Sequence, residues 1–256
     1  MKAIGIIPAR LAATRFPNKP MARICGMPMV GHCYHRARLS TGIEAAYVAT
    51  CDQEISDYVE SIGGVAIATA NTHTRATTRT AEAVEHIEAS AGEQIDIVVM
   101  VQGDEPLTRP ETISETLKHF TDPAVNIVNI MGRLGSREQF LDKNNVKVVV
   151  DQNQDAIYFS REPIPSPWKG VEGVLMYVQT GVIAFRRDAL IHFNALPETM
   201  LEQAESVDMN RVLEHGGKVR MVLSEAQALS VDTPEELDLA ERVMAEDPTL
   251  TRYLDS

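Results

Sequence analysis

The sequence has little cysteine and no long apolar run. Its three cysteines are an odd number and lack metal-site spacing, which argues against a disulfide framework. No apolar run approaches the roughly 18 residues that a membrane span requires, and the apolar stretch at the N-terminus is too short for a signal peptide. We therefore expect a globular protein of the cytoplasm.

The length and composition are those of an ordinary globular protein. The 256 residues are 44% apolar and 23% charged. A chain of this length buries roughly 70–75% of its unfolded surface and needs no disulfide or metal to stabilise its core. Because α/β folds of this size often remain undivided, a single domain over residues 1–256 is expected.

Basic residues are distributed unevenly along the chain. The net charge of −12 disfavours general binding to nucleic acid or anionic lipid. Residues 1–40, however, contain seven of the 24 Lys and Arg residues and none of the 36 Asp and Glu residues. This segment predicts a local site for a polyanion. The alternatives are a chance composition and a cationic patch that faces an acidic partner subunit.

Apolar runs alternate with amphipathic stretches in the first 120 residues. The runs are rich in Ile, Val and Ala, which is typical of doubly buried strands in a parallel sheet. Strands are predicted over residues 2–8, 45–50 and 95–101, and helices over residues 28–40, 53–62 and 78–90. The alternation implies right-handed βαβ units and a doubly wound sheet.

The second half of the chain has a more mixed pattern. Strands are predicted over residues 124–131, 146–151, 156–160 and 178–185, and helices over residues 187–194, 201–215 and 234–245. Because few helices separate these strands, antiparallel pairing is expected. Residues 162–174 are rich in proline and glycine and predict a surface loop, in which Trp168 could cover a substrate or pack in a dimer.

Three segments follow predicted strands and should meet at one edge of the sheet: residues 8–20, 50–52 and 102–106. The first carries Arg10, Arg15 and Lys19, and these cations with nearby backbone N–H groups suit a triphosphate. The segment is not a Walker A loop, because GxxxxGK[ST] is absent. A solvated basic loop is the alternative.

Two aspartates stand at the ends of predicted elements. Asp104 follows a buried strand in the sequence VQGDEP, where a carboxylate can hold Mg²⁺ against a nucleotide phosphate; a simple turn is the alternative. Asp232 lies in SVDTPEEL, and this sequence by itself is typical of a helix start, with a cap, a proline and two acids in the first turn.

A set of motifs extends along nearly the whole chain. Its opening is Pro8-Ala9-Arg10, then Thr14-Arg15, Pro17 and Lys19-Pro20. It continues with VAT (48–50), VQGDEP (101–106), NVKVV (145–149), YFSR (158–161) and VDTPEEL (231–237). In order and approximate spacing these motifs resemble the sugar-acid cytidylyltransferases, most closely the 3-deoxy-manno-octulosonate cytidylyltransferase (CMP-Kdo synthetase) family. Five matches in register make the signal strong.

The resemblance implies a fold and an activity. The fold is a Rossmann-like nucleotidyltransferase fold, with a mostly parallel doubly wound sheet and an antiparallel extension, usually in a homodimer. The activity joins CMP from CTP to a sugar acid with Mg²⁺ and releases pyrophosphate, as in lipopolysaccharide biosynthesis. Residues 1–120 would form the nucleotide-binding half, and residues 121–256 the half for sugar-acid binding and dimerisation.

The family motifs also imply the site residues. Asp104 and Asp232 would bind the metal, and Asp232 can do so if Thr233 caps the helix instead. Arg10 and Lys19 would join the two aspartates as catalytic residues. The residues implied to contact CTP are Pro8, Ala9, Arg10, Arg15, Lys19, Thr77, Arg79 and Gln102. Arg161 and Gln179 would bind the sugar acid, and Arg161 would contact the carboxylate of that substrate. Lys147 could lie near the same pocket or pair with an acid on the sheet.

The chain departs from the family at three places. The family segment His-x-Ser-Gly-Thr-Asp/Glu-Arg is replaced by HTRATTR, residues 73–79, so that Arg75 stands in place of Ser. Gln179 stands where the family often has His, and Met209, beside Asn210, where it has Gln. These changes predict a paralogue that uses CTP but prefers a modified sugar acid, such as an amino-Kdo or a nonulosonic acid, to Kdo. A non-catalytic nucleotide-binding protein is the remaining alternative, and the retained aspartates argue against it.

Overall fold

The computed structural model describes residues 1–12, 16–168, 170, 174–224 and 229–254. Its strands are β1 (Ala3–Pro8), β2 (Arg23–Ile24), β3 (Met27–Pro28), β4 (Ala45–Thr50), β5 (Ala66–Ala68), β6 (Ile97–Val101), β7 (Ile127–Arg133), β8 (Lys147–Val150), β9 (Ala156–Ser160), β10 (Tyr177–Arg186) and β11 (Arg220–Leu223). Nine of them form one sheet in the order β11-β7-β10-β6-β1-β4-β5, with β8 and β9 attached beside β10. β2 and β3 form a separate small hairpin.

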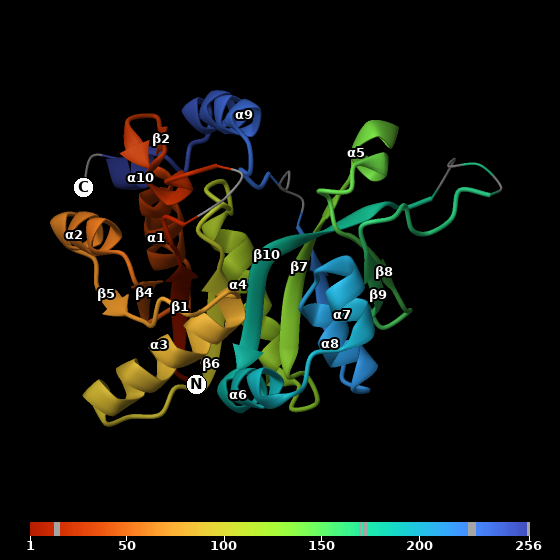
Figure 1. The fold of residues 1–256 in the computed structure, drawn as a ribbon, viewed down its shortest axis with the longest axis horizontal. Coiled ribbons are helices and arrows are strands. Elements are labelled where there is room, and N and C mark those ends of the chain that lie inside the picture. The colour runs from red at the N-terminus through yellow and green to blue at the C-terminus, as the bar shows by residue number, and fades with distance from the viewer. Residues whose placement is uncertain (13–15, 169, 171–173, 225–228, 255–256) are drawn as a thin grey trace.

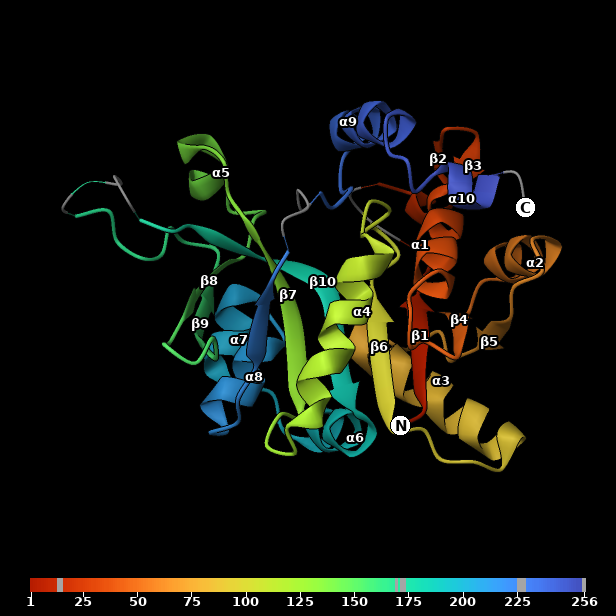
Figure 2. The ribbon, with the colours of Figure 1, turned by 180° about the vertical axis from the view of Figure 1, so that it is seen from behind.

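Helices cover both faces of the sheet (Figures 1 and 2). They are α1 (Met29–Arg38), α2 (Gln53–Ser61), α3 (Ala76–Ala91), α4 (Pro110–Lys118), α5 (Arg137–Leu141), α6 (Arg187–Ala195), α7 (Met200–Glu205), α8 (Met209–Glu214), α9 (Pro234–Ala245) and α10 (Thr251–Leu254), with 3-10 turns at Lys19–Met21 (η1) and His119–Thr121 (η2). No helix within the described ranges is long and apolar enough to cross a membrane.

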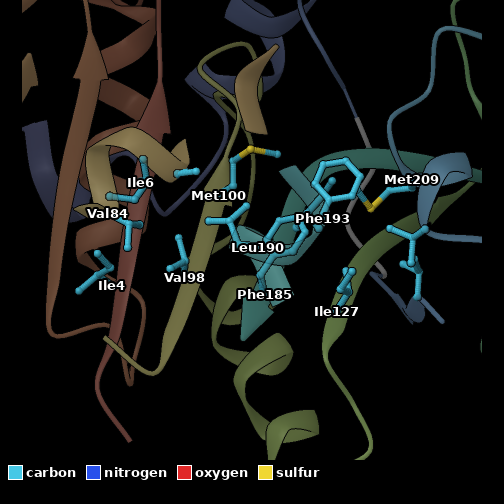
Figure 3. Packing of buried hydrophobic residues seen from close by; sticks show 14 of the residues in the cluster. Ile4, Ile6, Val84, Val98, Met100, Ile127, Phe185, Leu190, Phe193 and Met209 are labelled. Atoms are coloured by element: carbon cyan, nitrogen blue, oxygen red, sulfur yellow. The ribbon is translucent and has the colours of Figure 1, made fainter. Parts of the chain in front are cut away.

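Two apolar cores separate the layers. Val30 of α1 and Leu117 of α4 belong to the core on one face. Val84 of α3 and Phe193 of α6 belong to the core on the other face, which Figure 3 shows. The predicted α/β class with a doubly wound sheet is therefore confirmed.

The parallel part of the sheet is centred on β1, which pairs with β4 on one side and with β6 on the other. Every residue of β1 and β6 is buried, because both faces of these strands are covered. Both therefore read in the sequence as uninterrupted apolar runs. Their carboxyl ends, at Pro8 and Val101, lie at the same edge of the sheet.

The antiparallel part begins inside the sheet. β10 runs antiparallel between β6 and β7, whereas β11 pairs in parallel with β7. The hairpin of β8 and β9 pairs with the start of β10. The pairing of β10 with β7 is interrupted by a bulge, in which residues 180–182 of β10 lie opposite only Ile130 of β7.

The helix predicted over residues 201–215 is in fact two helices, α7 and α8. Ser206 ends α7 in the left-handed region, with φ at 53°. The break buries both Val207 and Met209 while Asp208 between them lines a pocket. Apolar periodicity predicted one helix because a single left-handed residue does not change the spacing of the apolar residues.

The C-terminal segment is held against the N-terminal half by a buried network. Tyr253 Oη donates to His32 Nδ1 at 2.8 Å, and His32 Nε2 donates to the Ile24 carbonyl at 2.8 Å. Burial lowers the pKa of His32 to about 4, so the ring is neutral near pH 7. Val231 packs in the same apolar cluster as Ile24 and Tyr253, which brings the neighbouring Asp232 over the first half of the chain.

Candidate active site

A cleft of about 330 Å³ lies over the carboxyl ends of β1 and β6. Its walls come from the loop after β1, the loop after β6, the start of α3 and the segment before α9. The predicted residues that line it are Pro8, Ala9, Arg10, Lys19, Arg79, Gln102, Asp104 and Asp232. The structure thus gathers most of the predicted nucleotide-side residues in one place.

Lys19 lies between the two aspartates on the wall of this cleft. Its Nζ donates to Asp104 Oδ2 at 2.7 Å and to Asp232 Oδ1 at 2.9 Å. Burial alone would lower the pKa of Lys19, but the two carboxylates raise it above the ordinary value. A backbone hydrogen bond from Val231 N to the Asp104 carbonyl, at 3.0 Å, joins the two segments that carry the aspartates.

Thr233, and not Asp232, caps α9. The Thr233 side chain accepts from Glu236 N at 3.2 Å, and Glu236 Oε2 accepts in return from Thr233 N at 2.9 Å. Glu236 also accepts from Asp232 N at 2.7 Å, so the capping box fixes the backbone of Asp232. The carboxylate of Asp232 lines the cleft and accepts from Lys19.

The loop after β1 is anchored by residues from two other loops. Arg10 Nη1 donates to the His73 carbonyl at 3.1 Å. Leu11 N donates to Asp52 Oδ2 at 2.7 Å, so Asp52 acts as an anchor for this loop. Sequence reasoning named the segment 50–52 but not this carboxylate. Arg15 lies outside the described residues.

The start of α3 contributes Arg79 and Thr77, which face different cavities. Arg79 is only 3% exposed and donates to Thr69 Oγ1, while its Nη2 has no hydrogen-bond partner in the described part of the chain. A buried unpaired donor beside a cleft favours a ligand that supplies an acceptor. Thr77 instead donates to Asp208 Oδ2 at 2.9 Å and lines a second pocket.

This second pocket, of about 560 Å³, adjoins the cleft and shares with it Arg10, Arg75, Gln102, Asp104 and Asp232. Arg161 and Gln179 line only the second pocket. Arg161 Nε donates to the Glu205 carbonyl at 2.7 Å, and its Nη1 donates to the Lys143 carbonyl at 2.9 Å. The side chain is therefore held in place by the backbone.

Lys147 lies next to the second pocket, as one of the two expectations for it requires, but it does not pair with an acid among the described residues. It is fully buried, and its Nζ donates to the carbonyls of Asp142 at 2.8 Å, of Asn145 at 2.7 Å and of Arg161. It lines neither the cleft nor the second pocket and has no acidic partner in the described residues. Burial lowers its pKa. The three carbonyls show that this lysine ties together the backbone around β8.

Two residues at departures from the family also serve the core. Met209 is fully buried in the apolar cluster shown in Figure 3, although it borders the second pocket. Asn210 Oδ1 accepts from Phe159 N at 3.3 Å, and its Nδ2 donates to the Phe159 carbonyl at 3.0 Å. Asn210 therefore joins α8 to β9, and it does not line the pocket.

Arg75 joins α3 to the helices of the second half. Its Nη2 lies 3.1 Å from both Glu198 and Glu202, and its Nη1 pairs with Asp208. The arginine also lines both the cleft and the second pocket. Sequence reasoning noticed that Arg75 is unusual but had no signal for its acidic partners, which are more than a hundred residues away.

Glu105 lies behind the aspartates and is 7% exposed. Its Oε1 accepts from Gly181 N at 2.7 Å. Burial, together with the charges of Asp104 and Asp232, raises the pKa of Glu105 to about 7. Glu105 thus connects the loop after β6 to the bulge of β10.

Sequence comparisons place the chain among cytidylyltransferases. A family model described as Cytidylyltransferase matches residues 4–223. A 3-deoxy-manno-octulosonate cytidylyltransferase from Anaeromyxobacter is 41% identical over 95% of this chain and 97% of its own length. The enzyme of that name from Escherichia coli is 38% identical over 96% of this chain and 97% of its own length.

Comparison of structures agrees. A solved structure of CMP:2-keto-3-deoxy-manno-octonic acid synthetase complexed with CTP has a TM-score of 0.87 and 37% identity, and the match covers 96% of this chain and 99% of that one. A 4-diphosphocytidyl-2C-methyl-D-erythritol synthase from Anaerococcus prevotii has a TM-score of 0.64 at 15% identity, over 96% of this chain and 99% of its own. This second likeness concerns the fold alone.

Proposed function

The chain belongs to the 3-deoxy-manno-octulosonate cytidylyltransferase family, and we propose that it transfers CMP from CTP to the sugar acid 3-deoxy-manno-octulosonate (Kdo) with release of pyrophosphate. The observation that carries this proposal is the cluster of Lys19, Asp104 and Asp232 at the carboxyl edge of the sheet. A cation held between two carboxylates supplies, in one small volume, charges for a metal and for a triphosphate.

CTP would occupy the smaller cleft. Arg10 and Lys19 would hold the phosphates, as would Arg15 by its place in the family motif. The unpaired Nη2 of Arg79 would donate to an acceptor of the nucleotide. The backbone at Pro8 and Ala9, with Gln102, completes the wall. Thr77 faces the second pocket, so its contribution would be to hold Asp208 and not to contact CTP directly.

Mg²⁺ fits the two aspartates. Their oxygens lie 2.7 and 2.9 Å from the same nitrogen of Lys19, so they are spaced to share one cation. Mg²⁺ is commonly held by one or two carboxylates together with phosphate oxygens and water. When bound, the metal neutralises phosphate charge and lowers the pKa of a coordinated hydroxyl. Lys19 could then move its ammonium from the carboxylates to a phosphate oxygen.

The sugar acid would occupy the second pocket. Arg161 lines the pocket, with its Nε and Nη1 fixed by the backbone, and would bind the carboxylate of the sugar acid. Gln179 lines the same pocket and would bind a hydroxyl. Because the two cavities share lining residues, a sugar bound in the second pocket would lie next to the phosphates. In this arrangement residues 1–120 mainly bind the nucleotide, and residues 121–256 mainly bind the sugar acid.

The rate of the reaction would depend on how the two substrates are positioned and on how the charge of the leaving pyrophosphate is stabilised. The anomeric hydroxyl oxygen of the sugar acid attacks the α-phosphorus of CTP, and a new P–O bond forms. The bond from the α-phosphorus to the bridging oxygen breaks, pyrophosphate leaves with the electron pair, and the hydroxyl proton passes to solvent. Arg10 and Lys19 stabilise the charge that grows on the pyrophosphate.

We also propose that the enzyme is a cytoplasmic homodimer. Trp168 is 89% exposed in the loop beyond the β8–β9 hairpin, and such an exposed aromatic side chain fits a subunit contact. Light scattering should give the mass of a dimer, and Trp168→Ala should shift the protein toward the monomer. A monomeric wild-type protein at micromolar concentration would contradict this proposal.

The activity is tested by measuring pyrophosphate release with CTP, Mg²⁺ and Kdo. The product should have the mass of Kdo plus CMP less one water. Omission of any of the three should stop the release. If CTP binds but no sugar acid supports release, the chain is a nucleotide-binding protein and not a transferase.

A modified sugar acid is a second candidate acceptor. It is favoured by Arg75, which lines both cavities and is held by Asp208 and Glu198. The comparison is kcat/KM for Kdo against 8-amino-Kdo and nonulosonic acids, at fixed CTP and Mg²⁺. A clear preference for Kdo would remove this second candidate and leave the first.

A further inference from the structure

The bulge of β10 forms part of the wall of the second pocket. Gln179, Thr180 and Gly181 all line that pocket. Gly181 N donates to Glu105, and its carbonyl accepts from Gln102 N at 3.1 Å. A Cβ at Gly181 would lie 2.8 Å from the Cβ of Gln102, so a glycine is required for this close approach. β7 and β10 run side by side in Figures 1 and 2, and the bulge faces β7.

Asn129 of β7 fills the bulge. It is fully buried, and its Nδ2 lies 2.8 Å from the Val182 carbonyl, 3.0 Å from the Thr180 carbonyl and 3.2 Å from the Ile130 carbonyl. An amide turned the other way would place Oδ1 against three carbonyl oxygens. The surrounding backbone therefore decides which end of the Asn129 amide is the donor.

This orientation determines that of Gln179. Asn129 Oδ1 can only accept, and the Gln179 amide approaches it at 2.7 Å. The atom of Gln179 that makes this contact is therefore Nε2, and Oε1 is the other branch of its amide. Oε1 has no partner among the described residues, and Gln179 borders the second pocket.

We propose that Asn129 is a positioning residue of the sugar-acid pocket, which fixes the Gln179 amide so that Oε1 accepts a hydrogen bond from the bound sugar acid. The substrate must then place a donor, a hydroxyl or an ammonium group, against this oxygen. This inference rests on the proposed function, and it adds a requirement on the chemistry of the acceptor. No residue of β7 was among those predicted from the sequence.

The requirement is tested first on the wild-type protein, with Kdo analogues in which each hydroxyl in turn, except the reacting anomeric hydroxyl, is replaced by fluorine. Fluorine is close to hydroxyl in size but cannot donate. At one position the replacement should lower kcat/KM about tenfold or more, the worth of one hydrogen bond. An amino group at that position should be tolerated. If every fluorinated analogue is used as well as Kdo, the inference is wrong.

Variants then assign the effect to residues. Gln179→Leu should raise KM for Kdo about tenfold and leave KM for CTP within twofold, and the sensitivity to fluorine should disappear. Gln152→Leu, in an exposed turn, is the matched control and should behave as wild type. A Gln179→Leu protein that keeps both the KM for Kdo and the fluorine sensitivity would overturn the inference.

The action of Asn129 through Gln179 is tested by comparing the two single variants with the double variant. Asn129→Ala should raise KM for Kdo as Gln179→Leu does, and the double variant should be no worse than the single ones. Additive losses would show that Asn129 acts independently of Gln179. If Asn129→Ala does not fold, the wild-type analogue series decides. Absence of pyrophosphate release from wild type with Kdo and every other acid would be a failure of the proposed function instead.

Discussion

Beside the cleft where we propose that CTP binds, Lys19 pairs with two carboxylates and Arg79 has an unpartnered Nη2 in the described part of the chain. Beside the pocket proposed for the sugar acid, Lys147 and Arg161 donate to backbone carbonyls. The first side consists of short loops after strands that the rest of the fold already supports. The second side includes the end of α7, where the Glu205 carbonyl accepts from Arg161, and the turn before β8, where the Asp142 and Asn145 carbonyls accept from Lys147. Lys19 is thus proposed to act in catalysis, whereas Lys147, which also belongs to a family motif, stabilises the backbone.

The comparison predicts that mutation separates activity from stability differently on the two sides. Charges that face the cleft should affect turnover and hardly affect folding. Charges that satisfy the backbone should affect folding and hardly affect the turnover of molecules that remain folded.

The largest effect is expected from Asp104→Asn. Loss of this charge should weaken the placement of Mg²⁺ and CTP and cost about 4 kcal/mol in the transition state, or about a thousandfold in kcat. Asp57→Asn, at an exposed position of α2, is the control and should keep full activity. A folded Asp104→Asn protein with more than about a tenth of wild-type activity at saturating Mg²⁺ would remove Asp104 from the metal site.

Asp232→Asn should lower kcat about a hundredfold, which corresponds to about 2.7 kcal/mol. Its thermal midpoint should barely change, because Thr233 makes the helix cap. Activity and melting temperature are measured on the same preparation. Near-normal turnover would show that Asp232 serves only the start of α9.

Lys147→Met should have the opposite effect, a loss of stability with little change in the turnover of the folded protein. The change leaves the carbonyls of Asp142, Asn145 and Arg161 without their shared donor and should lower the free energy of unfolding by about 2 kcal/mol. Urea denaturation measures this loss, and Lys118→Met on the exposed face of α4 is the matched control. If stability is unchanged while KM for Kdo rises, the contrast between the two sides fails.

The smallest effect is expected from Thr233→Ala, the structural counterpart of Asp232→Asn. Loss of the cap should cost about 1 kcal/mol of stability. Turnover of the folded protein should stay within about twofold of wild type, because the Asp232 carboxylate is not part of the capping box. A loss of activity as large as that of Asp232→Asn would mean that the cap itself positions the metal site.

Sequence reasoning located the elements whose pattern is local. β1 and β6 are continuous apolar runs because both of their faces are buried. The start of α9 was predictable from its capping residue and the proline in its first turn. β11 was not predicted, because it has only four residues. α4 was not predicted either, although Pro110 stands in its first turn. The break between α7 and α8 depends on one left-handed serine, which apolar periodicity cannot reveal.

The same division holds for the site. Lys19, Asp104 and Asp232 could be named because each belongs to a family motif, and the first two follow predicted strands. The partners of Arg75 and Thr77 could not, since Thr77 meets Asp208 across 131 residues of sequence. The role of Asn129 could not be predicted for another reason: it depends on a β-bulge that no sequence pattern indicates.

We propose above that Asp104 and Asp232 hold a metal on CTP at the position where Lys19 lies between them in this structure. The most direct measurement is a crystal structure of the protein with CTP and Mn²⁺, in which anomalous scattering locates the metal. We expect a peak between the two carboxylates, in contact with triphosphate oxygens, and we expect Lys19 Nζ to have moved from at least one carboxylate to a phosphate. Triphosphate bound elsewhere, with no peak at the aspartates and Lys19 still paired with both, would contradict it.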